Sequence, residues 1–330
     1  DMNLKELKIL FKKVDGINIL KRYKYANVIC FALLETLIIG FSKKSLEIVR
    51  LAVSNRIFNN LKKEYTPFIE DFKSKNIKSE KSKKSSIIWF CWFQGIENAP
   101  FIVKKCYESV LNNIKDRKII LITEKNYKEY ISFPEYIQEK IDNKIIKGAH
   151  FSDLIRLELL LKYGGTWIDA TVFCTSKNIP RYMLDSELFL FQCLKPGLDG
   201  HVTSVSNWFI TSYSNNIIIK LTRNLLYEYW RKNNKLVDYF IFHNMFQLAI
   251  ETYYEEWKKV VPFSNSIPHI LLLRLFDEYD KNIWNEIKLI TPFHKLTYKF
   301  EEDKTKIKNS YYNFIINEKE DDKYDDDKEK

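Results

Sequence analysis

Hydrophobic and polar positions near the start of the chain repeat with helical spacing. The periodicity predicts an amphipathic helix over residues 4–14, whose apolar positions are Leu4, Leu7, Phe11 and Val14. Residues 26–41 (ANVICFALLETLIIGF) are the most apolar stretch, but with 16 residues and Glu35 among them they are too short to span a membrane. A buried helix and an interfacial helix both fit this stretch. The lysine-rich residues 73–84 lack apolar periodicity and predict a linker, with a domain boundary near residue 85.

Beyond residue 85 the pattern alternates between short apolar runs and longer amphipathic segments. Such alternation favours an α/β fold with a mainly parallel central sheet, preceded here by an N-terminal helical region. We expect one helix to begin with Ser152 as its N-cap and to end at Gly164 or Gly165. The predicted strands are 86–93, 118–123 and 166–173, and the predicted helices are 101–113, 152–163, 216–232 and 239–258.

Composition supports a globular chain with uneven charge. Of the 330 residues, 45% are hydrophobic and 15% aromatic, which is enough for a sizeable core. Residues 1–85 hold 19 Lys and Arg against 9 Asp and Glu, a net charge of +10, which equals that of the whole chain. Residues 301–330 hold 11 acids against 7 bases and end in EKEDDKYDDDKEK, so we expect a charged tail there.

The five cysteines are odd in number and irregularly spaced, without a CxxC pair. This pattern indicates neither a disulfide framework nor a zinc site and fits a reducing cytoplasm. Residues 1–16 lack the basic, apolar, small-residue order of a secretory signal peptide, so we expect a cytoplasmic protein.

The segment YGGTWIDAT (163–171) places a single carboxylate, Asp169, at the predicted end of a strand. Ligands of open α/β sheets bind beyond the carboxyl ends of strands, so Asp169 is well placed to contact one. Asp153 and Arg156 are three residues apart and share one helix face, where the guanidinium can hold a carboxylate, hydroxyl or phosphate. A surface ion pair would have the same spacing.

Taken together, IIWFCW, SDLIRLELLLKYGG and TWIDAT resemble glycosyltransferase family 32, in particular its bacterial branch of capsular polysaccharide synthesis proteins. The segments are more distantly similar to the glucosyltransferase domains of large clostridial toxins. The resemblance covers about residues 85–300 and implies a GT-A fold, a nucleotide-sugar donor and retention of anomeric configuration. It leaves residues 1–84 as a basic helical region with linker and 301–330 as the tail.

The resemblance assigns the donor site residue by residue. Trp92 in IIWFCW matches the aromatic residue that stacks on the donor base, although a core tryptophan would look the same. Asp153 and Arg156 match the pair that holds the donor sugar, and Asp169 matches the first acid of the DxD motif, which contacts donor and metal. These three are the candidate catalytic residues.

The second acid of DxD is replaced here by Thr171, as is typical of the capsular branch. The resemblance implies a divalent cation, manganese or magnesium, yet the loss of a carboxylate should weaken its site. In HKLTYK, His294 is a further candidate metal ligand, and Lys295 and Lys299 could supply positive charge to the donor diphosphate. A solvated basic strand would give the same pattern.

Two further segments match the capsular branch. SNWF (206–209) follows the DxD position and makes Asn207 a candidate donor-binding residue, with a structural asparagine in a turn as the alternative. DYFIFH (238–243) makes Asp238 and His243 candidate acceptor-binding residues. The two lie five positions apart on a helix and need not act together, and His243 could equally be a buried histidine with its hydrogen bonds satisfied.

These assignments predict a retaining glycosyltransferase of capsular or surface polysaccharide synthesis that uses a UDP-sugar and a saccharide acceptor, itself lipid-linked. The basic N-terminal region would then contact anionic lipid at the inner face of the cell membrane. Nucleic acid is not expected as a partner, because no recognised binding motif accompanies the localised charge. An inactive membrane-docking protein with a transferase-like domain and a nucleotide-sugar hydrolase remain the alternatives.

Overall fold

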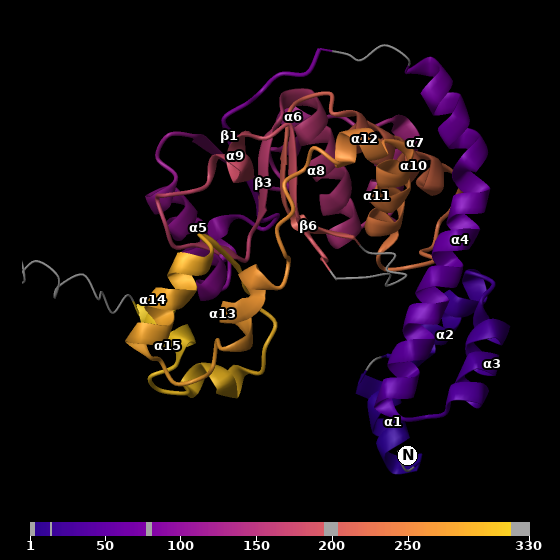
Figure 1. Ribbon diagram of the computed structural model, residues 1–330, viewed down its shortest axis with the longest axis horizontal. Helices are drawn as coiled ribbons and strands as arrows, with labels where there is room; N and C mark the ends of the chain where they lie inside the picture. Colours follow the sequence, from indigo (N-terminus) through magenta and orange to yellow (C-terminus); the bar gives the residue numbers. More distant parts are fainter. Residues whose placement is uncertain (1–3, 14, 77–80, 195–203, 318–330) are drawn as a thin grey trace, which may run out of the picture.

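Figure 1 shows the computed structural model, which describes residues 4–13, 15–76, 81–194 and 204–317. A five-stranded sheet with the order β2-β1-β3-β6-β5 forms its centre. Strand β1 pairs in parallel with β2 and β3, whereas β6 is antiparallel to both β3 and β5, so four strands run one way and β6 runs against them. The predicted α/β fold with a mainly parallel sheet is confirmed. The strands of this sheet are β1 (Ile87–Cys91), β2 (Lys118–Ile122), β3 (Gly165–Asp169), β5 (Leu188–Gln192) and β6 (Val205–Ser212).

Helices cover both faces of the sheet (Figure 1). Successive residues of a strand point to opposite faces of the sheet, so the apolar side chains of each strand are divided between two cores. Trp89 and Trp167 join the core beneath α8 (Ala149–Tyr163), α10 (Ile217–Lys232) and α11 (Ile241–Thr252). Ile88, Phe90 and Ile168 join the core beneath α5 (Phe101–Asn113) and the C-terminal helices.

The remaining elements are short and connect these layers. They are η1 (Ile96–Asn98), α6 (Tyr127–Tyr130), α7 (Glu135–Asp142), α9 (Arg181–Asp185), α12 (Tyr254–Trp257), η2 (Ile267–His269), α13 (Ile270–Leu273), α14 (Lys281–Ile290), η3 (Glu302–Lys306) and α15 (Tyr311–Asn317). The helix predicted at 239–258 is therefore two helices, α11 and α12, which meet at Tyr253.

The N-terminal region consists of α1 (Leu4–Lys13), α2 (Gly16–Tyr25), α3 (Ile29–Ile39) and the long α4 (Lys43–Lys75). Helix α4 packs against α10 and α11, and Lys62 Nζ lies 2.7 Å from Glu251 Oε2 across that contact. Helix α3 is not a core helix: Leu37 and Ile38 keep 72% and 70% of their surface exposed. The interpretation of residues 26–41 as a buried helix is therefore wrong, and the interfacial interpretation stays a prediction.

The double glycine lets the chain reverse tightly into β3. Gly165 has φ of 100°, and a Cβ there would lie 2.3 Å from the carbonyl oxygen of Ile87 in the neighbouring strand. The single strand predicted over 166–173 is broken after Asp169, since β4 (Val172–Cys174) pairs instead with β7 (Phe293–Lys295) in a second, two-stranded sheet. Ser152 is not the N-cap of α8, which begins earlier, after Gly148.

The C-terminal residues differ from the expected tail in their first half. Residues 301–317 contain η3 and α15, and Tyr311 is fully buried against the core. The tail prediction overlooked the apolar run YYNFII, whose aromatic rings anchor α15. Residues 318–330, together with residues 77–80 of the predicted linker, lie outside the described residues. The domain boundary near residue 85 stays a prediction.

Candidate functional site

A cavity of about 660 Å³ opens at the carboxyl ends of β1 and β3 and the start of β6. Helix α8 and the segment before α11 form one part of its wall, and η2 and β7 form another. This is the edge at which parallel α/β sheets bind ligands, because strand ends and helix starts bring polar groups together there. The cavity is lined by residues from segments far apart in the sequence, between Cys91 and Lys299.

Arg156 holds the two predicted aspartates together in this cavity. Its Nη1 donates to Asp153 Oδ1, and its Nη2 donates to Asp169 Oδ1 at 3.0 Å. Asp153 and Arg156 are only 6% and 3% exposed, so the alternative of a surface ion pair is wrong. The guanidinium carbon also lies 4.7 Å from the ring centre of Trp167, a distance that favours a cation–π contact.

Asp153 is the more deeply buried acid. Asn207 donates from Nδ2 to Asp153 Oδ1 at 2.8 Å, so the asparagine predicted from the SNWF segment reaches the same network. Burial raises the pKa of Asp153 to about 6, although Arg156 and Asn207 both act to lower it. The acid therefore changes its charge near neutral pH.

Asp169 presents its two oxygens to different partners. Oδ1 accepts from Trp167 Nε1 at 2.8 Å in addition to Arg156, while Oδ2 lies 3.8 Å from Lys295 Nζ. Lys295 in turn donates to Thr171 Oγ1. The pairing of β4 with β7 places Lys295 opposite Val172, immediately after the break in the predicted strand. Thus Thr171, which stands at the position of the second DxD acid, accepts a hydrogen bond from Lys295.

The structure offers few ligands for the expected divalent cation, which stays a prediction. Asp153 is engaged by Arg156 and Asn207, and the Lys295 ammonium lies beside the remaining oxygen of Asp169. Hard cations require several oxygen ligands, and a lysine next to the only other carboxylate repels them. Among the residues that the structure describes, three His, Cys, Asp or Glu side chains nowhere cluster as a metal site.

Four nitrogen atoms of cavity-lining side chains are buried without a hydrogen-bond partner. They are Trp92 Nε1, His150 Nδ1, Arg156 Nε and His243 Nδ1. Each unpaired buried polar atom costs free energy, and a ligand could pair with these four only after side chains move, because none of the atoms is exposed to the cavity. Burial, and secondarily Arg156, lowers the pKa of His243 to about 4, which keeps this histidine neutral.

Most of the predicted site residues meet in this cavity. The predicted site residues that line it are Trp92, Asp153, Arg156, Asp169, Asn207, His243, Lys295 and Lys299. Trp92 lines the cavity and also packs against the core, and its ring meets Tyr298 edge-on at 5.3 Å. Lys295 is not part of a solvated basic strand, since it is half-buried and donates to Thr171, whereas Lys299 lines the cavity but is exposed.

His294 and Asp238 lie elsewhere. The His294 side chain is fully buried in the second sheet, its Nε2 is 3.0 Å from Thr175 Oγ1, and burial lowers its pKa to about 3. Because neighbouring residues of a strand face opposite ways, His294 points away where Lys295 points in, so the metal role given to His294 has no support. Asp238 instead accepts from the backbone N–H of Phe240 at 3.0 Å, in the turn before α11.

Sequence reasoning missed His150 as a site group and also Tyr239, Asn265, His269 and Tyr298. Tyr298 could have been predicted, because it lies three residues after Lys295 and follows the strand that carries this lysine. His269 and Asn265 had none, because only the packing of η2 on β7 brings them to the cavity.

Comparison with known proteins identifies the family of the chain. No curated protein sequence matches the chain. Among solved structures it is similar to "PaToxG Glycosyltransferase", with 17% sequence identity and a TM-score of 0.36 over 82% of this chain and 98% of that one. The family model described as "Capsular polysaccharide synthesis protein" matches residues 38–315. That match spans most of the chain and includes every residue of the cavity, so the chain belongs to the capsular polysaccharide synthesis protein family.

Proposed function

We propose that the protein is a glycosyltransferase that moves a sugar from a nucleotide-sugar donor, preferably a UDP-sugar, to a saccharide acceptor during synthesis of a capsular or surface polysaccharide. One observation carries the proposal. One cavity at the carboxyl edge of the sheet brings an Asp–Arg–Asp network together with Asn207 and two lysines. A hydroxyl-rich ligand that carries a diphosphate would match this lining.

The cavity offers separate groups for the parts of such a donor. Trp92 has a flat face for the base and an unpartnered Nε1. Asp153, Arg156 and Asn207 form a hydrogen-bonded set suited to sugar hydroxyls. Lys295 and Lys299 bring two cations to the same cavity, where a diphosphate would need them.

The family resemblance implies retention, and no carboxylate of the described cavity residues stands out as a nucleophile, since Asp169 Oδ1 is already held by two donors, so we propose front-face attack. The acceptor oxygen forms its bond to the anomeric carbon as the bond from that carbon to the diphosphate oxygen breaks. The electron pair leaves with the diphosphate, which also takes the hydroxyl proton. Lys295 and Lys299 stabilise the departing charge, and the network orients the sugar.

The test is direct binding and turnover. We expect calorimetry to show a preference for one UDP-sugar over the free nucleotide, and Asp169→Asn to weaken it, with manganese and magnesium each added and withheld. Asp185→Asn, at the opposite edge of the sheet, is the matched control. Absence of binding to any nucleotide sugar would refute the proposal, and turnover that no saccharide acceptor accelerates would instead identify a nucleotide-sugar hydrolase.

We further propose that α3 and the start of α4 dock on an anionic membrane surface, where a lipid-linked acceptor would lie, at the cytoplasmic face. Among the described residues, no helix has both the length and the apolar content needed to cross a bilayer. The exposed apolar side chains of this surface are Leu33, Leu34, Leu37, Ile38, Phe41, Ile48 and Leu51. Lys43 and Lys44 are exposed at its rim, and each lysine near anionic lipid contributes about 1 kcal/mol.

The double variant Leu37→Glu/Ile38→Glu tests the membrane proposal. We expect its binding to phosphatidylglycerol vesicles to fall by about tenfold or more, because two apolar side chains are lost and two negative charges are added. Leu289→Glu is the control, since Leu289 is 79% exposed on α14. Equal vesicle binding by wild type and double variant would exclude this surface.

A further inference from the structure

His269 lies at the end of η2 and lines the cavity. Its Nδ1 is 2.7 Å from the carbonyl oxygen of Asn265. A carbonyl oxygen can only accept, so Nδ1 carries the proton and donates. In the neutral ring Nε2 then holds a lone pair, and no hydrogen bond from the described residues reaches it.

Neighbouring side chains fix the orientation of the ring. The Trp208 ring meets the His269 ring edge-on at 5.8 Å. Asn265, whose backbone holds Nδ1, is itself held by Ser206 Oγ at 2.5 Å and Trp208 Nε1 at 3.2 Å, both of which donate to its Oδ1. The tautomer and direction of the imidazole are therefore set before any ligand arrives.

His269 lies on the same side of the cavity as the basic strand. η2 packs against β7, which carries Lys295. Burial and the Lys295 charge lower the pKa of His269, against the hydrogen bond to Asn265, which raises it. The ring is thus neutral at neutral pH, next to the cation that we assign to the leaving diphosphate.

A neutral Nε2 beside Lys295 selects for one kind of ligand group. Phosphate oxygens only accept hydrogen bonds and would face a lone pair there, whereas a hydroxyl can donate to it. In transfer with retention by front-face attack, the incoming hydroxyl must lie beside the departing diphosphate oxygen. The group next to Lys295 is the one placed to receive it.

We infer that Nε2 of His269 accepts a hydrogen bond from the attacking hydroxyl of the acceptor sugar. The inference rests on the proposed glycosyl transfer. His269 orients the hydroxyl oxygen toward the anomeric carbon, and the hydroxyl proton passes to the departing diphosphate oxygen as the new bond forms. The residue thus belongs to the acceptor site, opposite in role to the donor-binding set on α8.

The experiment separates acceptor use from donor use in the full-length protein. We expect His269→Leu to lower kcat/KM for the best acceptor among a panel of p-nitrophenyl glycosides by about tenfold or more. Calorimetric binding of the UDP-sugar, and its slow hydrolysis with water as acceptor, should stay within about threefold of wild type. His269→Gln keeps an acceptor oxygen and should recover part of the lost transfer.

The possible outcomes differ in what they overturn. A His269→Leu protein that binds the UDP-sugar more weakly would place His269 in the donor site and refute the inference. Unchanged transfer in a variant with wild-type thermal unfolding would refute it as well. Failure of the wild type itself to bind any UDP-sugar would instead overturn the proposed function, and with it the inference.

Discussion

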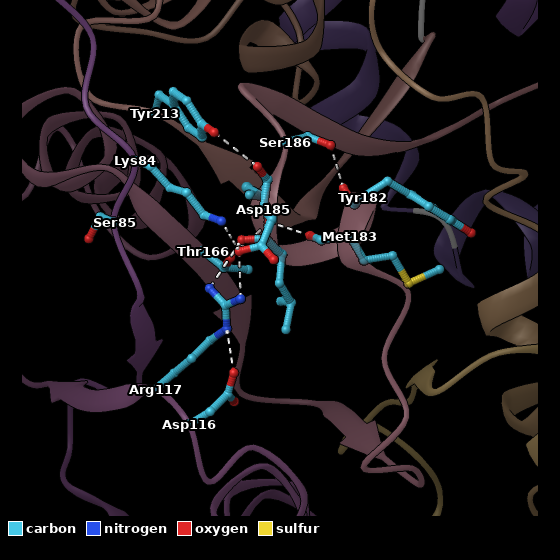
Figure 2. Close-up of polar contacts among 12 residues, drawn as sticks. Lys84, Ser85, Asp116, Arg117, Thr166, Tyr182, Met183, Asp185, Ser186 and Tyr213 are labelled. Atoms are coloured by element: carbon cyan, nitrogen blue, oxygen red, sulfur yellow. Dashed lines mark hydrogen bonds and ion pairs between the residues drawn. The ribbon is translucent and has the colours of Figure 1, made fainter.

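The two edges of the central sheet carry the same kinds of charged residue but organise them differently. At the amino edge, Asp185 accepts from Arg117 Nη2 at 2.7 Å and lies 2.9 Å from Lys84 Nζ (Figure 2). Arg117 also donates to the carbonyl oxygen of Leu184, and Tyr213 donates to that of Asp185. This cluster joins the segment before β1 to the starts of β2 and β5.

Arg117 and Arg156 illustrate the difference between the two edges of the sheet. Arg117 has one unpaired nitrogen, Nε, which still lies 3.9 Å from Asp116. Arg156 also leaves Nε unpaired, but it lines a cavity and divides its guanidinium between two carboxylates. An Asp–Arg pair therefore indicates a binding site only where space and unsatisfied groups accompany it; otherwise it fastens the fold.

The largest expected effect is on catalysis. Arg156→Met should lower kcat/KM for transfer by about 10²- to 10³-fold, because both aspartates lose their shared donor. Arg117→Met, the matched change at the amino edge, should leave kcat/KM of the folded protein within about threefold. Steady-state kinetics on both variants measures kcat/KM. Equal losses of kcat/KM would contradict the assignment of the site to the carboxyl edge alone.

A second variant sharpens the role of the lysine at the carboxyl edge. Thr171→Asp should pair with Lys295 and neutralise it, so that turnover without added metal falls by about tenfold or more. The new carboxylate near Asp169 should make manganese restore activity. Assays with EDTA and with manganese measure this, and turnover in EDTA equal to wild type would show that Lys295 does not supply the charge.

At the amino edge the expected effect is on stability. Asp185→Asn should lower the free energy of unfolding by about 1–3 kcal/mol, since the mostly buried Arg117 loses its charged partner. Nucleotide-sugar binding should not change. Denaturant unfolding measures the loss, and an Asp185→Asn protein that is stable but inactive would contradict the structural role.

The last expected effect concerns pH. With a pKa of about 6, Asp153 is mostly protonated at pH 5, so kcat/KM should fall by about tenfold between pH 7 and pH 5. Its folded pKa exceeds the ordinary 3.8, so its contribution to stability falls as pH rises from about 4 to 6.

Asp185 behaves in the opposite way. Burial acts to raise its pKa, but hydrogen bonds from Arg117 and Lys84 outweigh burial and lower it. Its contribution is present above the ordinary pKa and lost as pH falls through the folded one. Unfolding curves of wild type, Asp153→Asn and Asp185→Asn from pH 3 to 7 should therefore differ with opposite slopes, and parallel curves would refute both assignments.

Much of the fold could be predicted because its signals are local. The helix at 101–113 agrees with α5 to the residue, and β1 and β2 lie within their predicted runs. In the site, Asp153 and Arg156 were predictable since helical spacing alone puts them on one face. The break after Asp169 was not, because it depends on β4 pairing with a strand more than 100 residues later.

The sequence by itself determined the α/β alternation, the basic N-terminal region and the motifs that carry the family resemblance, since periodicity and charge are properties of neighbouring residues. Tertiary structure decided which candidates meet. It turned Lys295 into the site and His294 away from it, brought His269 to the cavity, and left α3 exposed. These outcomes depend on strand pairing and on packing between distant segments, which no local pattern encodes.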